Sequence, residues 1–394
     1  LIFSFLIAKD LFNKKIALYS LIFLAFIPLH IDYSVFSYVD GTVTFLAVLS
    51  VYLALKNRIM GSSIVAGLAI LTKYNGAFIV PVLLFIVYMK NKNDMKNLMR
   101  NAAIITIIPM AIGAIWFTRN WIYLGNPAWP FMNNVFNGYE VMSFAQSGTG
   151  SISLANVQDL SGIISIYLGI FGVPNGNINT LSFFSIPYLN LLFAIWILAT
   201  IIFIIPFLIG LPSKKLNHKN LLLVWIVSYI VLVLLYIVNA GFSISRFLLP
   251  AFPAVALIWA HGLQKITVPR IKQIFYVLLT LIIIGFILTS YVKIGFAAKT
   301  WSFYDDDFEW VKSNTNKNSI FLTGSQCISY NIERQTLSPY TNNLEKADYV
   351  WVNQDFSLDR MAHLNKDIIS ELDKGGMGPV YENKKTNTRI YRIR

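Results

Sequence analysis

The sequence predicts a polytopic all-α membrane bundle of about nine or ten helices, followed by a small α/β domain at the C-terminus. Three observations lead to this prediction. Hydrophobic residues make up 56% of the 394-residue chain, apolar runs of about 15–24 residues recur before residue 300, and the composition becomes polar after it. A soluble domain of average composition has fewer apolar residues. We therefore expect a transmembrane domain at 1–299 and a soluble domain at 300–394.

The apolar runs define the expected membrane helices. The first, at 1–8, is short and begins with leucine rather than methionine, so we interpret the sequence as lacking an N-terminal portion. Several other runs are short for a hydrocarbon core of roughly 30 Å, and 62–89 is also open to interpretation as a tight helical hairpin. After the first, helices are expected at 16–30, 41–55, 62–73, 76–89, 102–118, 188–211, 220–240, 247–264 and 273–296.

The connections between these helices differ in charge. By the positive-inside rule, connections rich in lysine and arginine face the cytoplasm, so we expect a multi-pass cell-membrane protein whose C-terminal domain is extracytoplasmic. The net charge of +13 reflects this orientation. Nucleic-acid binding is excluded as its cause because the charges lie in short loops. The basic connections contain Lys9, Lys14, Lys15, Lys56, Arg58, Lys90, Lys92, Lys96, Arg100, Lys214, Lys215, Lys219, Lys265, Arg270 and Lys272.

The C-terminal domain has nearly equal numbers of acidic and basic residues and no long apolar run. Short β-branched and aromatic runs predict strands, and two longer polar segments predict helices, the second closed by glycines. No glycine-rich nucleotide-binding loop occurs. The expected strands lie at 318–324, 348–353, 378–382 and 388–394, and the expected helices at 305–314 and 357–376.

The opposite set of connections contains only three basic residues: Lys73, Arg119 and Arg246. A charge near the bilayer is costly, about 2.5–3.5 kcal/mol at a helix centre, so each one needs a partner or an aqueous cavity. Snorkelling of a side chain to the headgroups would explain any one of them alone. Each lies at the outer end of an expected helix, Arg119 at the end of 102–118. Three cations at one depth indicate convergence on a bound anion, most simply a phosphate.

Asp40 lies at the very start of the expected helix 41–55, on the same outer side. The simplest interpretation is a helix N-cap, which suits aspartate. The alternative is a carboxylate that positions an acceptor hydroxyl or a metal ion. The long outward connection at 119–187 is a further functional candidate, either as interfacial aromatic anchors or as a lid over a substrate.

Four stretches in this order carry a family resemblance: "PLHIDYSVFSYVDGTVTFLAVLSVYLAL", "GLAILTKYNGAFIVPVLLF", "RNWIYLGNPAWPF" and "SRFLLPAFPAVALI". With them the chain resembles the integral-membrane glycosyltransferases of the GT-C class. The most similar branch is the dolichyl-phosphate-mannose protein mannosyltransferase-like group, here called PMT/ArnT-like, which includes the aminoarabinose transferases of lipid A. Each stretch alone is weak, and the four in order extend the resemblance over essentially the whole chain.

The resemblance implies a cell-envelope glycosyltransferase. Such an enzyme moves a sugar, with inversion, from a polyprenyl-phosphate donor to a hydroxyl of a lipid, glycan or protein on the outer face of the membrane. Lys73, Arg119, Asn120 and Arg246 are then the expected phosphate-binding residues. Asp40 corresponds to a supporting acidic residue. A divalent metal ion is left open, and no other cofactor is expected.

The family's main catalytic base lies in the first outward loop, which the resemblance places before Leu1. An inverting transfer needs a carboxylate to accept the acceptor's proton, so we expect residues 1–394 alone to be inactive. The first helix and the first outward loop of the transmembrane domain would be the missing part.

Three other interpretations remain. One is a polytopic transporter or flippase for lipid-linked sugars, and another is a non-catalytic membrane assembly protein. The third is a sugar-binding role for 300–394 alone, with Trp301, Trp310 and Trp351 stacking on sugar rather than packing in a core. The sugar, the acceptor, the length of the lipid carrier and the oligomeric state do not follow from the sequence.

Overall fold

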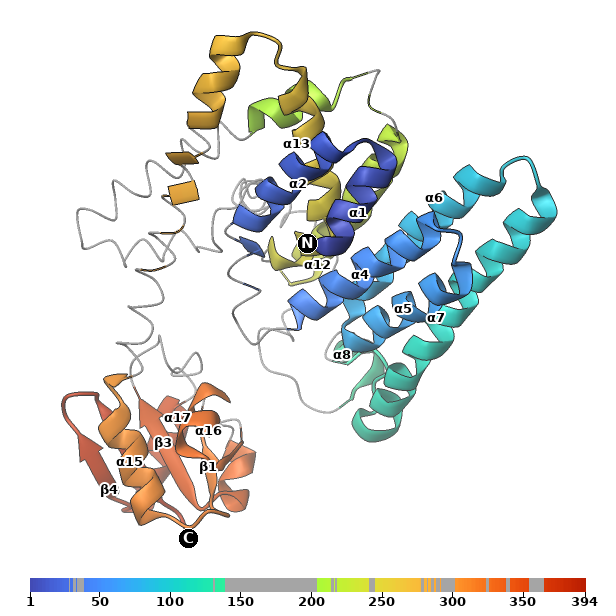
Figure 1. The fold of residues 1–394 in the computed structure, drawn as a ribbon. Helices are drawn as coiled ribbons and strands as arrows, with labels where there is room; N and C mark the ends of the chain where they lie inside the picture. The colour runs from blue at the N-terminus through green and yellow to red at the C-terminus, as the bar shows by residue number, and fades with distance from the viewer. Residues whose placement is uncertain are drawn as a thin grey trace. The chain divides into compact units, whose positions relative to one another are not determined.

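In the computed structural model of the protein, the chain forms two compact units, Leu1–Ile287 and Leu288–Arg394, each visible in Figure 1. The boundary between the two units follows Ile287, whereas the sequence predicted that the transmembrane domain ends at residue 299. The structure describes residues 1–138, 204–291 and 302–394, apart from gaps at 28, 31–32, 34–38, 130–131, 214–215, 217, 241–244, 278–279, 282, 285–286, 288–290, 324–325, 338–340 and 354–364.

Every regular element among the described residues of the first unit is a helix, as predicted. Within these residues, three segments are long and apolar enough to cross a membrane, Tyr74–Asn91, Met95–Leu124 and Arg246–Lys265. The helices are α1 (Ile2–Leu11), α2 (Lys14–Phe26), α4 (Asp40–Leu55), α5 (Ile59–Thr72), η1 (Tyr74–Ile79), α6 (Val80–Asn91), α7 (Met95–Leu124), α8 (Asn133–Phe136), α12 (Lys219–Ala240), η4 (Ser245–Ala251) and α13 (Phe252–Lys265).

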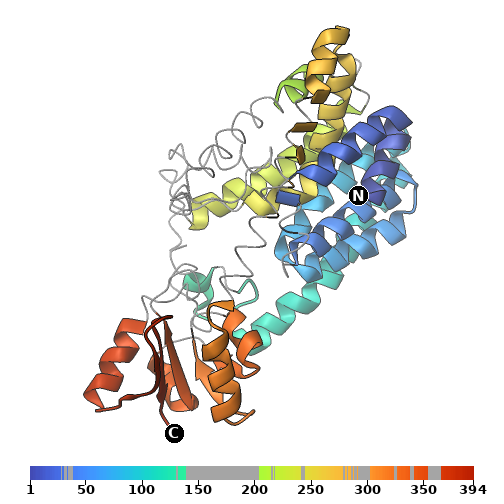
Figure 2. The same ribbon diagram turned by 60° about the vertical axis from the view of Figure 1, so that its left-hand side comes forward.

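Helix α13 is almost wholly buried from Phe252 to Leu263 and is mostly apolar, as expected of a helix packed among other helices. Trp259 of α13 stacks on Phe23 of α2, with ring centroids 4.6 Å apart. Helix α5 packs between α4 and α7, which run beside it in both views (Figures 1 and 2). This arrangement confirms the predicted membrane bundle.

The largest boundary error concerns helix α7, expected at 102–118. The helix begins at Met95, where the Asp94 side chain accepts a hydrogen bond from the Asn97 backbone amide, and it continues to Leu124. Arg119 therefore lies inside the helix rather than at its end. The prediction followed the apolar run alone, whereas a cap and a polar first turn extend a helix beyond such a run. Most of the expected helices 188–211 and 273–296, and of the connection 119–187, lies outside the described residues.

The second unit contains one five-stranded sheet in the order β2-β1-β3-β5-β4. Strand β1 pairs in parallel with β2 and β3, and β5 pairs antiparallel with β3 and β4. The strands are β1 (Ile320–Leu322), β2 (Gln335–Leu337), β3 (Tyr349–Asn353), β4 (Pro379–Asn383) and β5 (Thr388–Arg392); the helices are α15 (Asp305–Asn314), α16 (Gln326–Ile332), η5 (Thr341–Lys346) and α17 (Asn365–Lys374).

Helices cover both faces of this sheet (Figure 2). Alternating side chains explain why: Phe321 and Trp351 pack with α15 and α16 on one face, whereas Leu322 and Val350 pack with α17 on the other. The predicted small α/β domain is confirmed. The four expected strands are present, but β2 and α16 were missed, and the first part of the helix expected at 357–376 lies outside the described residues.

The tryptophans of this unit are largely accounted for by packing. Trp351 is fully buried and stacks on Phe308, with ring centroids 5.8 Å apart. Trp310 stacks on Tyr381 at 4.7 Å. Trp301 lies outside the described residues. Core packing therefore explains the two described tryptophans without a sugar ligand.

Arg334 joins the ends of two helices in this unit. The side chain is only 6% exposed. Its guanidinium donates to the carbonyls of Lys312 and Thr315 at the end of α15, and to those of Ile332 and Glu333 after α16. A fixed planar cation suits such carbonyls because they are unpaired at a helix C-terminus and carry its negative dipole.

Replacing Arg334 with methionine is expected to destabilise the second unit by about 2–3 kcal/mol, because several buried carbonyls lose a charged donor. Hydrogen exchange of the full chain would show this as lost amide protection in α15. Arg389→Met is a matched control, since Arg389 forms an exposed ion pair with Glu382, and such pairs contribute about 0–1 kcal/mol. Equal effects of the two changes would contradict the role given to Arg334.

Candidate functional site

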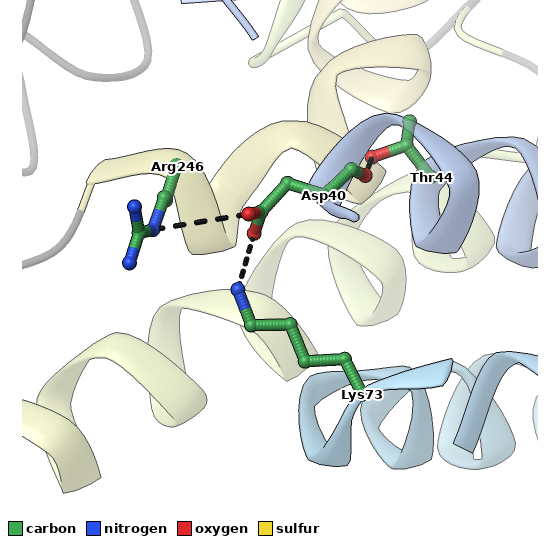
Figure 3. Close-up of polar contacts among 4 residues, drawn as sticks. All are labelled: Asp40, Thr44, Lys73 and Arg246. Atoms are coloured by element: carbon green, nitrogen blue, oxygen red, sulfur yellow. Dashed lines mark hydrogen bonds and ion pairs between the residues drawn. The ribbon is translucent and has the colours of Figure 1, made fainter. Parts of the chain in front are cut away.

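Asp40, Lys73 and Arg246 come together in the first unit from α4, the end of α5 and η4 (Figure 3). The Lys73 ammonium lies 2.8 Å from Asp40 Oδ1, and Arg246 Nε lies 3.9 Å from Asp40 Oδ2. The Asp40 side chain is 1% exposed, whereas those of Lys73 and Arg246 are 22% and 23% exposed. A buried carboxylate is thus bracketed by two cations that reach the surface.

Asp40 is the first residue of α4, and Val39 precedes it as the N-cap without a side-chain hydrogen bond. The expectation that Asp40 is an N-cap is therefore wrong. Its side chain turns to the two cations instead of to the backbone amides of the helix. The Asp40 backbone carbonyl accepts a hydrogen bond from Thr44 Oγ1 at 2.8 Å, which holds the first turn of the helix.

The local sequence explains why Lys73 lies where it does. Helix α5 ends at Thr72, and Lys73 is extended, with φ −165° and ψ 144°. The chain then turns back as η1, and a Cβ atom on Gly76 would lie 2.4 Å from the backbone of Ala69. Only glycine permits this close approach. Pro81 in the first turn of α6 is compatible with the restart of the helix.

Aromatic rings lie beside both cations. The Lys73 ammonium is 4.8 Å from the Phe247 ring centroid, and the Arg246 guanidinium carbon is 5.8 Å from that of Tyr33. The two terminal nitrogens of Arg246 point away from Asp40 (Figure 3). Two cations against one carboxylate leave the cluster with an excess positive charge, which favours a bound anion.

A pocket of about 190 Å³ borders this cluster. Its lining includes Gly41, next to Asp40 in α4, and Leu249, which follows Arg246 in η4. Tyr33, whose ring lies beside Arg246, also lines it, together with apolar side chains such as Phe45 and Val48. The pocket therefore offers apolar surface next to a positively charged group.

A second polar cluster is centred on Tyr74, the residue after Lys73. The Tyr74 hydroxyl accepts hydrogen bonds from Trp116 Nε1 at 3.1 Å and Asn120 Nδ2 at 2.9 Å, and it donates to the Trp129 carbonyl. Asn120 is fully buried, and its Oδ1 accepts a hydrogen bond from Arg119 at 2.9 Å. These contacts join η1 to α7 and to the segment after it.

The three basic residues Lys73, Arg119 and Arg246 thus divide between two clusters. The structure brings Lys73 and Arg246 together at Asp40, whereas Arg119 contacts Asn120, Trp116 and Tyr123 on its own helix. The two clusters meet through the peptide bond between Lys73 and Tyr74. Sequence reasoning therefore singled out residues of both clusters but not their separation.

Sequence reasoning missed Tyr74, Trp116 and Asn75. The position of Tyr74 directly after Lys73, a candidate residue already, was the signal that could have identified it. Asn75 is 3% exposed, and neither of its side-chain polar atoms has a hydrogen-bond partner among the described residues. Within that same part of the chain, no group of three or more His, Cys, Asp or Glu side chains could hold a metal ion.

Comparisons with known proteins agree with the resemblance drawn from the sequence. Residues 1–122 match the family model described as dolichyl-phosphate-mannose-protein mannosyltransferase. A crystal structure of ArnT from Cupriavidus metallidurans bound to undecaprenyl phosphate aligns over 100% of this chain and 81% of that chain, with 12% identity and a TM-score of 0.58.

The apo crystal structure of ArnT from the same organism aligns with 14% identity and a TM-score of 0.44, over the same shares of the two chains. No curated protein matches the sequence. The family match in the first 122 residues and the shared fold with the lipid-bound ArnT together confirm the PMT/ArnT-like, GT-C resemblance.

Proposed function

We propose that this chain, a PMT/ArnT-like protein of the GT-C class by its first 122 residues and its fold, is a membrane glycosyltransferase that uses a polyprenyl-phosphate-linked sugar. The reaction proposed is transfer of the sugar, with inversion, to a hydroxyl of a lipid, glycan or protein on the outer face. The leaving group would be the polyprenyl phosphate, whose growing negative charge requires fixed cations.

The observation that supports this proposal most is the pairing of Lys73 and Arg246 across Asp40. Two cations that reach the surface over one buried carboxylate leave a positive charge to receive a phosphate. The crystal structure of ArnT with undecaprenyl phosphate supports the choice of ligand. Apolar side chains lining the adjacent pocket would suit the start of a prenyl chain.

Asp40 is proposed as a supporting residue rather than as the base that takes the acceptor's proton. Support comes from its two oxygens, which face Lys73 and Arg246, so the carboxylate would hold the side chains proposed to bind the phosphate. Arg119 and Asn120 remain part of the proposed site, in the neighbouring cluster. A metal ion, if one takes part, would need ligands beyond the groups described above.

The proposed orientation has Lys73, Arg119 and Arg246 on the outer side, together with residues 300–394. Support comes from the concentration of lysine and arginine in the alternate connections. Labelling of single cysteines with a membrane-impermeant thiol reagent in intact cells would test it. We expect the reagent to label a cysteine at position 375 and not a cysteine at position 57. The reverse pattern of labelling would contradict the proposed orientation.

The direct test of function is the lipid that the protein retains. We expect mass spectrometry of lipids extracted from the purified full chain to detect a polyprenyl phosphate, and added undecaprenyl phosphate to bind. Undecaprenol, which lacks the phosphate, should bind at least about tenfold more weakly because the charge-assisted contacts are lost. Equal binding of the two lipids, or of neither, would contradict the proposal.

A further inference from the structure

Lys73 and Tyr74 send their side chains to different neighbours. Because Lys73 is extended, with φ −165° and ψ 144°, successive side chains leave the backbone on opposite sides. The Lys73 side chain reaches Asp40 of α4, whereas that of Tyr74 reaches α7. The turn between α5 and η1 is therefore held from two sides.

The Tyr74 hydroxyl uses its whole hydrogen-bonding capacity. A phenol has one proton to donate and two lone pairs with which to accept, and here the proton goes to the Trp129 carbonyl while Trp116 and Asn120 donate to the oxygen. One partner lies after α7 and two lie within it. The hydroxyl therefore fixes the turn to two separate stretches of chain.

The segment after α7 is itself folded to present that carbonyl. Gly125 ends α7 with φ +66°, a left-handed conformation that favours glycine. Asn126 is fully buried, and its Oδ1 accepts a hydrogen bond from the Ala128 amide at 2.9 Å. Its backbone carbonyl accepts one from the Trp129 amide at 3.2 Å. This compact turn places the Trp129 carbonyl at Tyr74.

We propose that Tyr74 is a positioning residue for the phosphate site. Its hydroxyl, anchored by α7 and by the turn after it, fixes the Lys73 ammonium at Asp40. Arg119 acts on the site through Asn120 and Tyr74 rather than by contact with the phosphate. This inference rests on the proposed function, because it concerns how the lysine of that site is held.

The physical basis is the freedom of a lysine side chain. A long, partly exposed lysine side chain loses rotamer entropy when it binds an anion. A fixed backbone turn lowers the total entropic cost of binding, because the backbone of Lys73 already has the position that the bound state needs. Removing the hydroxyl takes away three hydrogen bonds while keeping the ring, which also packs 5.5 Å from Phe117. The loss is expected to appear as about tenfold weaker binding of the phosphate.

The test uses the detergent-solubilised full chain with undecaprenyl phosphate as the probe and undecaprenol as the neutral control. Tyr74→Phe should weaken binding of the phosphate about tenfold and leave that of undecaprenol unchanged. Tyr88→Phe is the matched control, because Tyr88 is half-exposed on α6, and it should have no effect. Asn120→Asp keeps an oxygen that accepts the hydrogen bond from Arg119 but removes the amide N–H that donates to the Tyr74 hydroxyl. This variant should therefore bind the phosphate about threefold more weakly.

A double-mutant cycle separates positioning from a general structural role. If Tyr74 acts through Lys73, adding Tyr74→Phe to Lys73→Met should cause no further loss of phosphate binding. An additive loss, or an equal loss of undecaprenol binding, would overturn the inference. Unchanged phosphate binding by Tyr74→Phe and Asn120→Asp, in a wild type that does bind, would overturn it too. A wild-type chain that binds no undecaprenyl phosphate would instead refute the proposed function.

Discussion

Replacing Lys73 with methionine is expected to weaken binding of undecaprenyl phosphate by about 100-fold. The change removes the cation nearest to Asp40, at 2.8 Å, and with it the charge-assisted contact that we propose it makes to the phosphate. It also leaves a carboxylate that is 1% exposed with Arg246, at 3.9 Å, as its remaining cationic partner among the described residues. Breaking a buried ion pair costs about 3–5 kcal/mol of folding stability. The loss of affinity is a separate effect, in which each factor of ten corresponds to about 1.4 kcal/mol.

The double variant Lys73→Met with Asp40→Asn distinguishes the two parts of this effect. Removing the buried negative charge should restore most of the lost thermal stability, because no unpaired carboxylate remains. Binding of undecaprenyl phosphate should stay weak, since the cation is still absent. Lys92→Met, at an exposed position after α6, is the control. If the double variant regained binding, Lys73 would be a partner of Asp40 alone and no phosphate ligand.

Replacing Asp307 with alanine is expected to destabilise the second unit by about 3–5 kcal/mol. Asp307 is fully buried in α15. Its carboxylate accepts hydrogen bonds from Tyr381 at 2.7 Å, Asn383 at 2.6 Å and Thr388 at 2.7 Å. Each hydrogen bond to a charged group contributes about 1.5–3 kcal/mol, and the three are not independent. One side chain thus fastens α15 to the hairpin of β4 and β5.

The Tyr381 phenol is a reliable donor in this network. Burial, together with its hydrogen bond to Asp307, raises the pKa of Tyr381 to about 12, so the proton stays on the phenol throughout the neutral range. Asp307→Asn should cost about half as much as Asp307→Ala, because the amide keeps one accepting oxygen.

Hydrogen exchange of the full chain would measure the Asp307 effect as lost amide protection in α15 and β5, with the first unit unchanged. Asp306→Ala is a matched control in the same helical turn, since Asp306 is exposed, and it should change protection little. Equal effects at the two positions would show that the network contributes nothing beyond the charge at the start of α15.

Much of the fold could be predicted because its signals are local. The strands at 349–353 and 388–392 show short β-branched and aromatic runs, and α15 begins with three aspartates that favour a helix N-terminus. Strand β2 was missed because it has three residues and only one apolar side chain. It exists because β1 offers an edge with which to pair.

The candidate site shows the same division. Lys73, Arg119 and Arg246 were recognisable because they lie at the ends of apolar runs in connections with few other basic residues, and a charge near the bilayer is costly. Their partners were not recognisable. Arg119 bonds to Asn120 of its own helix, whereas Asp40 pairs with Lys73 and Arg246 from other segments, and only the packing of the helices decides which segments meet.

The amino-acid sequence by itself determined a helical membrane bundle and a polar α/β unit at the C-terminus, and it predicts a sidedness for the loops. These properties follow from transfer free energies of runs and loops, which each segment carries alone. Only the tertiary structure decided that Asp40 pairs with Lys73 and Arg246, that Tyr74 joins their turn to α7, and that Asp307 holds the hairpin. Such contacts join segments far apart in the chain, and their geometry depends on helix packing that no local pattern encodes.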